Sequence, residues 1–177
     1  MSSSVITQQS TGLATETQSG LVSTDTQSFA GDKTFVNIVF QPQQPIISGQ
    51  MGSAMLDPAS PQKLAFNEFW VSRGITYDSV NRRFIVPVAG VYRITLNPFF
   101  IQGVASGRVL VGVNTDAPTV TNHYGHAYRQ SAEYETGCIN SIVSLNANDY
   151  IVFYLASGSL YNQTSDKFNQ FSIELIG

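Results

Sequence analysis

The sequence of 177 residues has few charges: Asp, Glu, Lys and Arg together make up 12% of it, roughly half of the usual share in globular domains. Its apolar content of 42% is in the ordinary range. A surface so poor in charge predicts that other copies of the chain or a partner cover much of it. The net charge of -3 offers no electrostatic basis for binding nucleic acid or an anionic membrane.

Cysteine is nearly absent as well, because Cys138 is the only one. A single thiol excludes a disulfide within the chain and a zinc site built from several cysteines. The run CINSIVSL (138–145) has the pattern of a strand. We therefore expect Cys138 to be a small buried residue.

Long apolar runs are also missing. No stretch approaches the roughly 18 residues that a membrane-spanning helix needs, so we expect no membrane insertion. The first ten residues, MSSSVITQQS, have neither the basic nor the apolar region of a secretory signal. We expect synthesis in a host cytoplasm.

The composition changes near Phe35. Residues 1–33 are mostly Ser, Thr, Gln, Gly and Ala, and they contain a near repeat, GLATETQS (12–19) and GLVSTDTQS (20–28). Such a segment cannot bury enough apolar surface to offset the entropy lost on ordering. We predict an extended attachment arm over residues 1–35 and a folded domain over residues 36–177.

Beyond the arm, short apolar runs alternate with clusters of Gly, Pro, Asn, Asp and Ser, which turn the chain. No segment has the pattern of a long amphipathic helix. Many short strands at this spacing predict an all-β antiparallel sandwich or barrel. The predicted strands are residues 35–41, 52–57, 75–78, 83–88, 90–102, 108–115, 138–145, 149–156 and 168–177.

Two predicted strands differ in polarity. In residues 168–177, Phe171 and Ile173 alternate with polar side chains, which is typical of one buried and one wet face. Residues 150–155, YIVFYL, have no polar position. The second face of that strand needs a cover, either a loop of the same chain or, as the low charge favours, a neighbouring subunit.

Residues 63–96, KLAFNEFWVSRGITYDSVNRRFIVPVAGVYRITL, resemble the signature of the complement globular-head family within the tumour-necrosis-factor-like jelly rolls. The signature consists of an apolar strand, a Tyr-Asp turn, a Phe strand, a Pro and a Gly-Val-Tyr strand. The Leu-x-x-x-Asp pattern of Leu145 and Asp149 and the aromatic-rich last strand are similar too. The matching positions of the first segment are Tyr77, Asp78, Phe84, Pro87, Gly90, Val91 and Tyr92.

This resemblance extends over residues 46–177 and implies a jelly roll of about ten strands. It also implies a homotrimer around a three-fold axis with an apolar inner sheet, which would cover YIVFYL. The residues expected in the trimer interface or the core are Tyr77, Phe84, Tyr92, Tyr150, Val152, Phe153, Tyr154 and Phe171.

The sequence predicts the local role of four residues. A side chain at Gly90 would crowd the turn into the next strand. Asp78 and Asp149 are expected to accept backbone N–H groups in tight turns, with a calcium ligand as the alternative for Asp149. We expect Trp70 in the core rather than as a platform on which a ligand stacks.

Signals of catalysis are scarce. His123 and His126 are three residues apart and lack a third metal ligand. Glu133 and Glu135 share one face of an extended segment, as two solvated glutamates or, alternatively, as a glycosidase pair. Neither a phosphate-binding loop nor a nucleophile elbow is present. We therefore expect no enzyme, no cofactor and no metal.

The arm also points to a function. Residues 20–35, GLVSTDTQSFAGDKTF, resemble segments of tailed-bacteriophage structural proteins and bacterial surface fibres that precede a knob. This resemblance implies a virion structural protein on the capsid exterior. Without a collagen-like or heptad shaft, we expect a capsid decoration (cement) or head-fibre protein bound to the major capsid protein or another virion protein. The expected attachment residues are Leu13, Leu21, Val22, Phe29 and Phe35.

The alternative function is a tail-fibre or receptor-binding tip that recognises a host surface glycan or protein. A third, a knob on a bacterial spore surface, has the same fold and no virion. In a tip, the ligand would meet the aromatic loop over residues 121–134, since Tyr and His edges pack on sugars and donate hydrogen bonds. The expected ligand-loop residues are His123, Tyr124, His126 and Tyr128.

Overall fold

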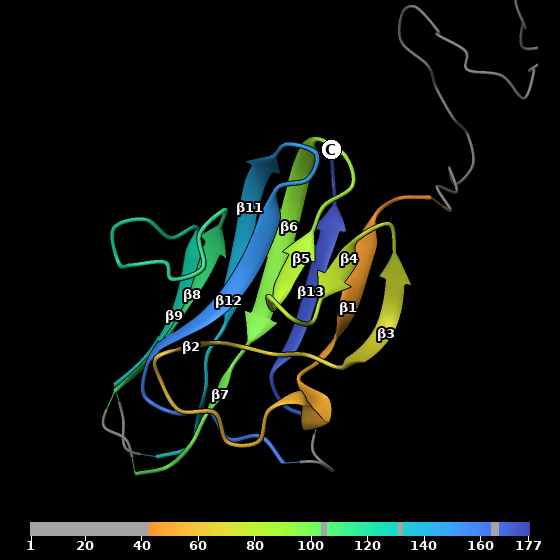
Figure 1. Cartoon of the computed structure of the whole chain (residues 1–177). Coiled ribbons are helices and arrows are strands. Elements are labelled where there is room, and N and C mark those ends of the chain that lie inside the picture. Colours follow the sequence, from red (N-terminus) through yellow and green to blue (C-terminus); the bar gives the residue numbers. More distant parts are fainter. Residues whose placement is uncertain (1–42, 104–105, 131–132, 164–166) are drawn as a thin grey trace, which may run out of the picture. The chain divides into compact units, whose positions relative to one another are not determined.

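The computed structural model describes residues 43–103, 106–130, 133–163 and 167–177. These residues form two antiparallel β-sheets that pack face to face, with one short 3-10 helix, η1 (Gly52–Ala54) (Figure 1). The prediction of an all-β antiparallel sandwich is therefore confirmed. The predicted arm and the predicted strand over residues 35–41 lie outside the described residues.

The first sheet has the strand order β11-β6-β13-β1-β3. Its two longest strands alternate between buried and outward side chains, which gives the sheet one core face and one outward face. In spatial order its strands are β11 (Ile139–Leu145), β6 (Gly90–Asn97), β13 (Gln170–Leu175), β1 (Ile46–Gln50) and β3 (Glu68–Arg73).

The second sheet has the order β4-β5-β12-β8-β9, and β2 (Gln62–Lys63) also pairs with β12. A separate two-stranded ladder joins β7 (Phe99–Phe100) to β10 (Glu135–Thr136). The strands of the second sheet are β4 (Thr76–Asp78), β5 (Arg83–Ile85), β12 (Tyr150–Ser157), β8 (Gly107–Val113) and β9 (Gly125–Arg129).

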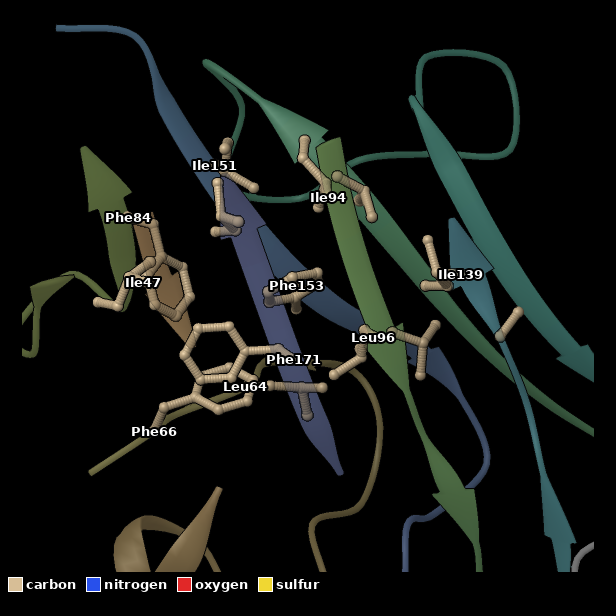
Figure 2. Close-up of a cluster of buried hydrophobic side chains, with 14 of the residues drawn as sticks. Ile47, Leu64, Phe66, Phe84, Ile94, Leu96, Ile139, Ile151, Phe153 and Phe171 are labelled. Atoms are coloured by element: carbon tan, nitrogen blue, oxygen red, sulfur yellow. The ribbon is translucent and has the colours of Figure 1, made fainter. Parts of the chain in front are cut away.

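Aliphatic and aromatic side chains together fill the space between the sheets (Figure 2). The ring of Phe171 lies 4.7 Å from that of Phe66 and 4.8 Å from that of Phe84. Tyr92 is fully buried, and its hydroxyl donates to the carbonyl of Val88 at 2.9 Å. Burial raises the pKa of Tyr92, so this phenol remains a neutral donor within the core.

Strand β12 lies in the second sheet, and the same chain covers its outward face. Val152 is fully buried outside the main core cluster. A Cβ on the neighbouring Gly112 would lie 2.9 Å from Val152 and 3.1 Å from Pro118, which belongs to the loop after β8. The Arg83 guanidinium lies 4.1 Å from the ring of Tyr150. Of the two covers considered for this strand, the structure shows the loop of the same chain at Val152, while Tyr150 and Tyr154 are half-buried.

The predicted strand over residues 52–57 is also wrong. Gly52 has a φ of +56°, and η1 begins there. The buried side-chain amide of Asn162 donates to the carbonyls of Gly52 at 2.7 Å and Met55 at 2.8 Å. These contacts hold the backbone in a turn that the local sequence does not specify.

Two residues expected in the interior are exposed. Where β3 pairs with β1, Ser48 faces Val71 and Gly49 faces Phe69, so Trp70 is the extra residue of a β-bulge. The bulge turns the indole outward, and Trp70 is 52% exposed. Cys138 is also exposed, since it precedes β11 and Ile139 takes the inward position.

The turn predictions are confirmed. The carboxylate of Asp78 accepts the N–H groups of Val80 at 3.0 Å and Asn81 at 2.9 Å. The hydrogen bond from the Asn81 backbone is the main cause that lowers the pKa of Asp78. Asp149 accepts the N–H of Asn146 at 2.7 Å, and a Cβ at Gly90 would collide with the chain's last strand.

Candidate functional site

The candidate ligand site is a pocket of about 240 Å³ over β8, β9 and the loop of residues 114–124 that joins them. In the pairing of β8 with β9, Arg108 lies opposite Tyr128, and Leu110 lies opposite His126. Because side chains alternate along a strand, these four point to the outward face of the second sheet. The residues that line the pocket are Arg108, Leu110, Val120, His123, His126 and Tyr128.

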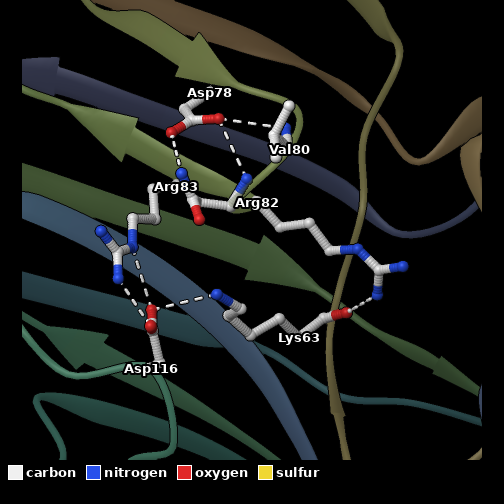
Figure 3. A network of polar contacts seen from close by, with 7 residues as sticks. Lys63, Asp78, Val80, Arg82, Arg83 and Asp116 are labelled. Carbon is white, nitrogen blue, oxygen red and sulfur yellow. Dashed lines mark hydrogen bonds and ion pairs between the residues drawn. The ribbon is translucent and has the colours of Figure 1, made fainter.

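The loop is anchored at its start by an ionic clamp (Figure 3). The guanidinium of Arg83 donates twice to the carboxylate of Asp116, at 2.6 and 3.0 Å, and Lys63 lies 3.1 Å from the same group. These partners, Arg83 first, lower the pKa of Asp116 to about 2. The loop that carries Val120 and His123 is thereby tied to β5 and β2.

A second anchor lies at the end of β8. Asn114 has a φ of +54°. Its side-chain amide donates to Asp149 at 2.8 Å and accepts the N–H of Tyr150 at 3.0 Å. The carboxylate of Asp149 therefore accepts hydrogen bonds in two turns, from the side chain of Asn114 and from the N–H of Asn146.

The two histidines are joined by a hydrogen bond. Nε2 of His123 lies 3.0 Å from Nδ1 of His126, and Nδ1 of His123 lies 3.2 Å from the carbonyl oxygen of Thr119. A carbonyl only accepts, so Nδ1 of His123 carries a proton. In the neutral pair, Nε2 of His123 then accepts from Nδ1–H of His126. Nε2 of His126 is left with a lone pair.

Arg108 and Tyr128 form one wall of the pocket. The guanidinium carbon of Arg108 lies 4.9 Å from the centre of the Tyr128 ring, within the range of a cation–π contact. Leu110 is buried beneath the pocket and forms its apolar floor. The arrangement combines one cation, one hydrogen-bond acceptor and an apolar surface, which are elements of a binding site.

Three of the four expected ligand-loop residues meet in this pocket: His123, His126 and Tyr128. Tyr124 does not line it; its N–H donates to the carbonyl of Val111 at 2.9 Å, and its side chain is exposed. The pocket also contains Arg108, Leu110 and Val120, which were not expected. Only strand pairing brings Arg108 and Leu110 to the histidines, so no local motif identifies them.

The other predicted residues have structural positions. Phe84, Tyr92, Phe153 and Phe171 are buried between the sheets, and Tyr77 packs against them. Tyr154 is half-buried on β12, opposite Lys63 of β2. The carboxylate of Glu133 accepts from Gln102 at 3.0 Å, and Glu135 lies in β10. The five expected attachment residues lie outside the described residues.

The second surface of interest is the outward face of the first sheet, here called the open face. Its exposed apolar side chains include Trp70 and Ile142, the latter 63% exposed. Arg93 and Glu174 on this face pair with each other at 3.1 Å. The residues that define the open face are Ser48, Trp70, Arg93, Thr95, Asn140, Ile142, Ser144, Ser172 and Glu174.

The described residues contain no group of three or more His, Cys, Asp or Glu side chains that is arranged to hold a metal ion. They also contain no helix that is long and apolar enough to cross a membrane.

Comparison with known proteins identifies the fold. No protein-family model matches the chain, and no curated protein sequence matches it. The solved structure of Eiger TNF from S. frugiperda is similar, with a TM-score of 0.56 over 76% of this chain and 94% of that chain. The chain has a TNF-like jelly-roll fold. At 8% sequence identity the likeness concerns the fold alone.

Proposed function

We propose that the protein is a homotrimeric structural protein of a virion exterior, in which the jelly-roll knob is attached to the capsid by its N-terminal arm. The observation that carries this proposal is the open face. The TNF-like fold and the resemblance of residues 20–35 to bacteriophage structural segments support it. The expected partners are two further copies of the chain and the major capsid protein or another virion protein.

The open face is suited to contact with another copy. Arg93 and Glu174 are paired with each other, and the hydroxyls of Thr95 and Ser172 bond to each other at 2.8 Å. This pairing lowers the cost of burying these groups, although removing an ion pair from water still costs free energy. Trp70 is 52% exposed, and covering that part of an aromatic side chain of roughly 250 Å² contributes about 3 kcal/mol before ordering costs. Ile142 adds a second apolar contact in each copy.

The arm gives the trimer a means of attachment. A chain of about 35 residues reaches about 110 Å when extended, which is enough to cross neighbouring capsid subunits. Its Ser and Thr residues with isolated apolar ones suit addition as a strand to an exposed sheet edge. Three arms in one trimer combine weak individual contacts through effective concentration.

Light scattering of the full chain tests the trimer. We expect a mass of three chains, and Ile142→Lys should give monomers, because the added cation lies opposite Arg93 and would be buried without a partner. Val80→Lys is the matched control, since Val80 is exposed in the β4–β5 turn. Trp70 is the only tryptophan, so its emission should shift to the red in the Ile142→Lys protein alone. A monomeric native chain would refute the assembly.

Attachment is tested on purified particles. We expect many copies distributed over the capsid, and we expect a chain that lacks residues 1–33 to form the knob but not join the particle. Normal incorporation of the shortened chain would contradict the role of the arm. A few copies confined to the tail would instead support the second candidate, a receptor-binding tip, which the pocket over β8 and β9 favours.

A further inference from the structure

We propose that the pocket over β8 and β9 binds a saccharide unit that carries a carboxylate. This inference goes beyond the assembly role and does not depend on it. It rests on the charge of the pocket, on its size and apolar floor, and on the acceptor nitrogen that the histidine pair presents.

The charge of the pocket favours an anionic group. Arg108 is the charged residue among those that line it, and none of them is acidic. The contact with Tyr128 holds the guanidinium at the wall. A guanidinium presents N–H donors in a planar fork that matches the two oxygens of a carboxylate. Arg108 is therefore assigned to the carboxylate of the ligand.

The size and floor of the pocket favour a single ring. Its volume of about 240 Å³ is slightly below the roughly 300–1,000 Å³ typical of sites for drug-sized ligands. Leu110 and Val120 provide apolar surface for the C–H face of a pyranose, and Tyr128 adds an aromatic wall. A free inorganic anion would leave these contacts unused.

The histidine pair supplies the third element. Two successive hydrogen bonds, from His123 to the Thr119 carbonyl and from His126 to His123, leave a lone pair on Nε2 of His126. That nitrogen accepts a hydrogen bond from a sugar hydroxyl. A cation beside a neutral acceptor distinguishes a hydroxylated acid from a simple carboxylate and from a neutral sugar.

The test is a titration of the uniformly ¹⁵N-labelled full chain, followed by amide NMR, with glucuronate, glucose, acetate and inorganic phosphate. Glucose lacks the carboxylate, and acetate lacks the ring. We expect glucuronate to shift amides of β8, β9 and residues 114–124, with a dissociation constant at least about tenfold below those of the other three. Glucose loses the charged hydrogen bond to Arg108, and acetate and phosphate lose the apolar contacts of the ring, and either loss is on that order.

Two variants assign the roles. Arg108→Gln should weaken glucuronate binding by about tenfold or more, and His126→Phe should reduce the preference for glucuronate over acetate. Lys167→Gln is the matched control, because Lys167 lines a different hollow; its loss of one positive charge should leave binding unchanged. The amide spectrum of each variant reports its folding.

Three results would overturn the proposal. Equal binding of acetate or phosphate would make the pocket a simple anion site, and equal binding of glucose would remove the role of Arg108. Amide shifts confined to other parts of the domain, or no shifts at all, would exclude the pocket itself. This last measurement uses the native chain and therefore decides even if a variant fails to fold.

Discussion

The clamp on Asp116 predicts a stability change that depends on pH. The substitution Asp116→Asn keeps the size of the side chain and removes the charge that Arg83 and Lys63 bind. The pKa of Asp116 falls from 3.8 to about 2 in the folded protein, which corresponds to roughly 2.4 kcal/mol at 1.36 kcal/mol per pKa unit. Asp116 is 44% exposed, so solvent screening reduces the expected loss to about 1 kcal/mol.

The direction of the pH dependence follows from the lowered pKa. Asp116 is more acidic in the folded protein than in the unfolded chain, so its carboxylate stabilises the fold at pH values above 3.8. That contribution falls as the pH drops toward 2, and about half of it remains at pH 3. The difference between native protein and Asp116→Asn should therefore be largest near neutral pH and shrink in acid.

The measurement is urea unfolding of the full chain at pH 7, 4 and 3, with every variant at one protein concentration because unfolding of an oligomer depends on it. Lys63→Gln should lower the free energy of unfolding by less than Asp116→Asn does, since Arg83 is the principal partner of Asp116. A double-mutant cycle that combines Asp116→Asn with Arg83→Gln gives the interaction energy between these two side chains. The contact of Arg83 with Tyr150 does not contribute to that energy. No loss at pH 7, or the same loss at pH 7 and pH 3, would refute the reasoning.

Two further predictions concern the core and the start of β9. Phe171→Ala should lower the free energy of unfolding by about 3–4 kcal/mol, because it leaves a cavity among aromatic rings. The control is Leu56→Ala, at an exposed leucine. In the same urea titration it should change the free energy of unfolding by less than about 0.5 kcal/mol. Gly125→Ala should lower it by about 1–3 kcal/mol, since the added Cβ would collide with the hydroxyl of Ser141; a thermal midpoint equal to that of the native protein would contradict this.

The sequence predicts the long strands because their apolar alternation is set by burial between two sheets. Residues 138–145 and 168–177 contain β11 and β13, and residues 90–102 contain β6 and β7, with the break at Pro98. Proline lacks the N–H that a ladder requires, which accounts for the break. These patterns involve residues close together in the sequence, so the strands can be predicted from the sequence alone.

Strand β9 is hidden in the sequence because its inward side chains are not typical of a core. Ala127 and Arg129 point inward, and Arg129 is 1% exposed. Its guanidinium donates to the carbonyl of Ile101, a partner 28 residues away in sequence. The polar residues His126 and Tyr128 point outward. Because a buried arginine with a distant partner is not a recognisable strand pattern, the sequence does not predict β9. It therefore does not predict the side of the ligand pocket that β9 forms.

The position of β12 changes how the two surfaces of the knob are assigned. The apolar sequence YIVFYL favours a cover by a neighbouring subunit. In the structure, the loop of residues 114–124, seen beside β8 and β9 in Figure 1, belongs to the same chain and covers Val152. The same loop brings Val120 and His123 over the pocket. One segment therefore both completes the hydrophobic packing of the second sheet and forms the ligand site.

The case for a subunit contact consequently rests on the first sheet, where Trp70 and Ile142 remain exposed. The outward faces of two sheets that pack against each other point in opposite directions. The proposed assembly surface and the proposed ligand pocket thus lie on opposite sides of the sandwich and do not compete for the same residues. Because β9 is an edge strand of the second sheet, a ligand reaches the pocket without opening the core. Assembly through the open face and recognition through the pocket are therefore compatible in one knob.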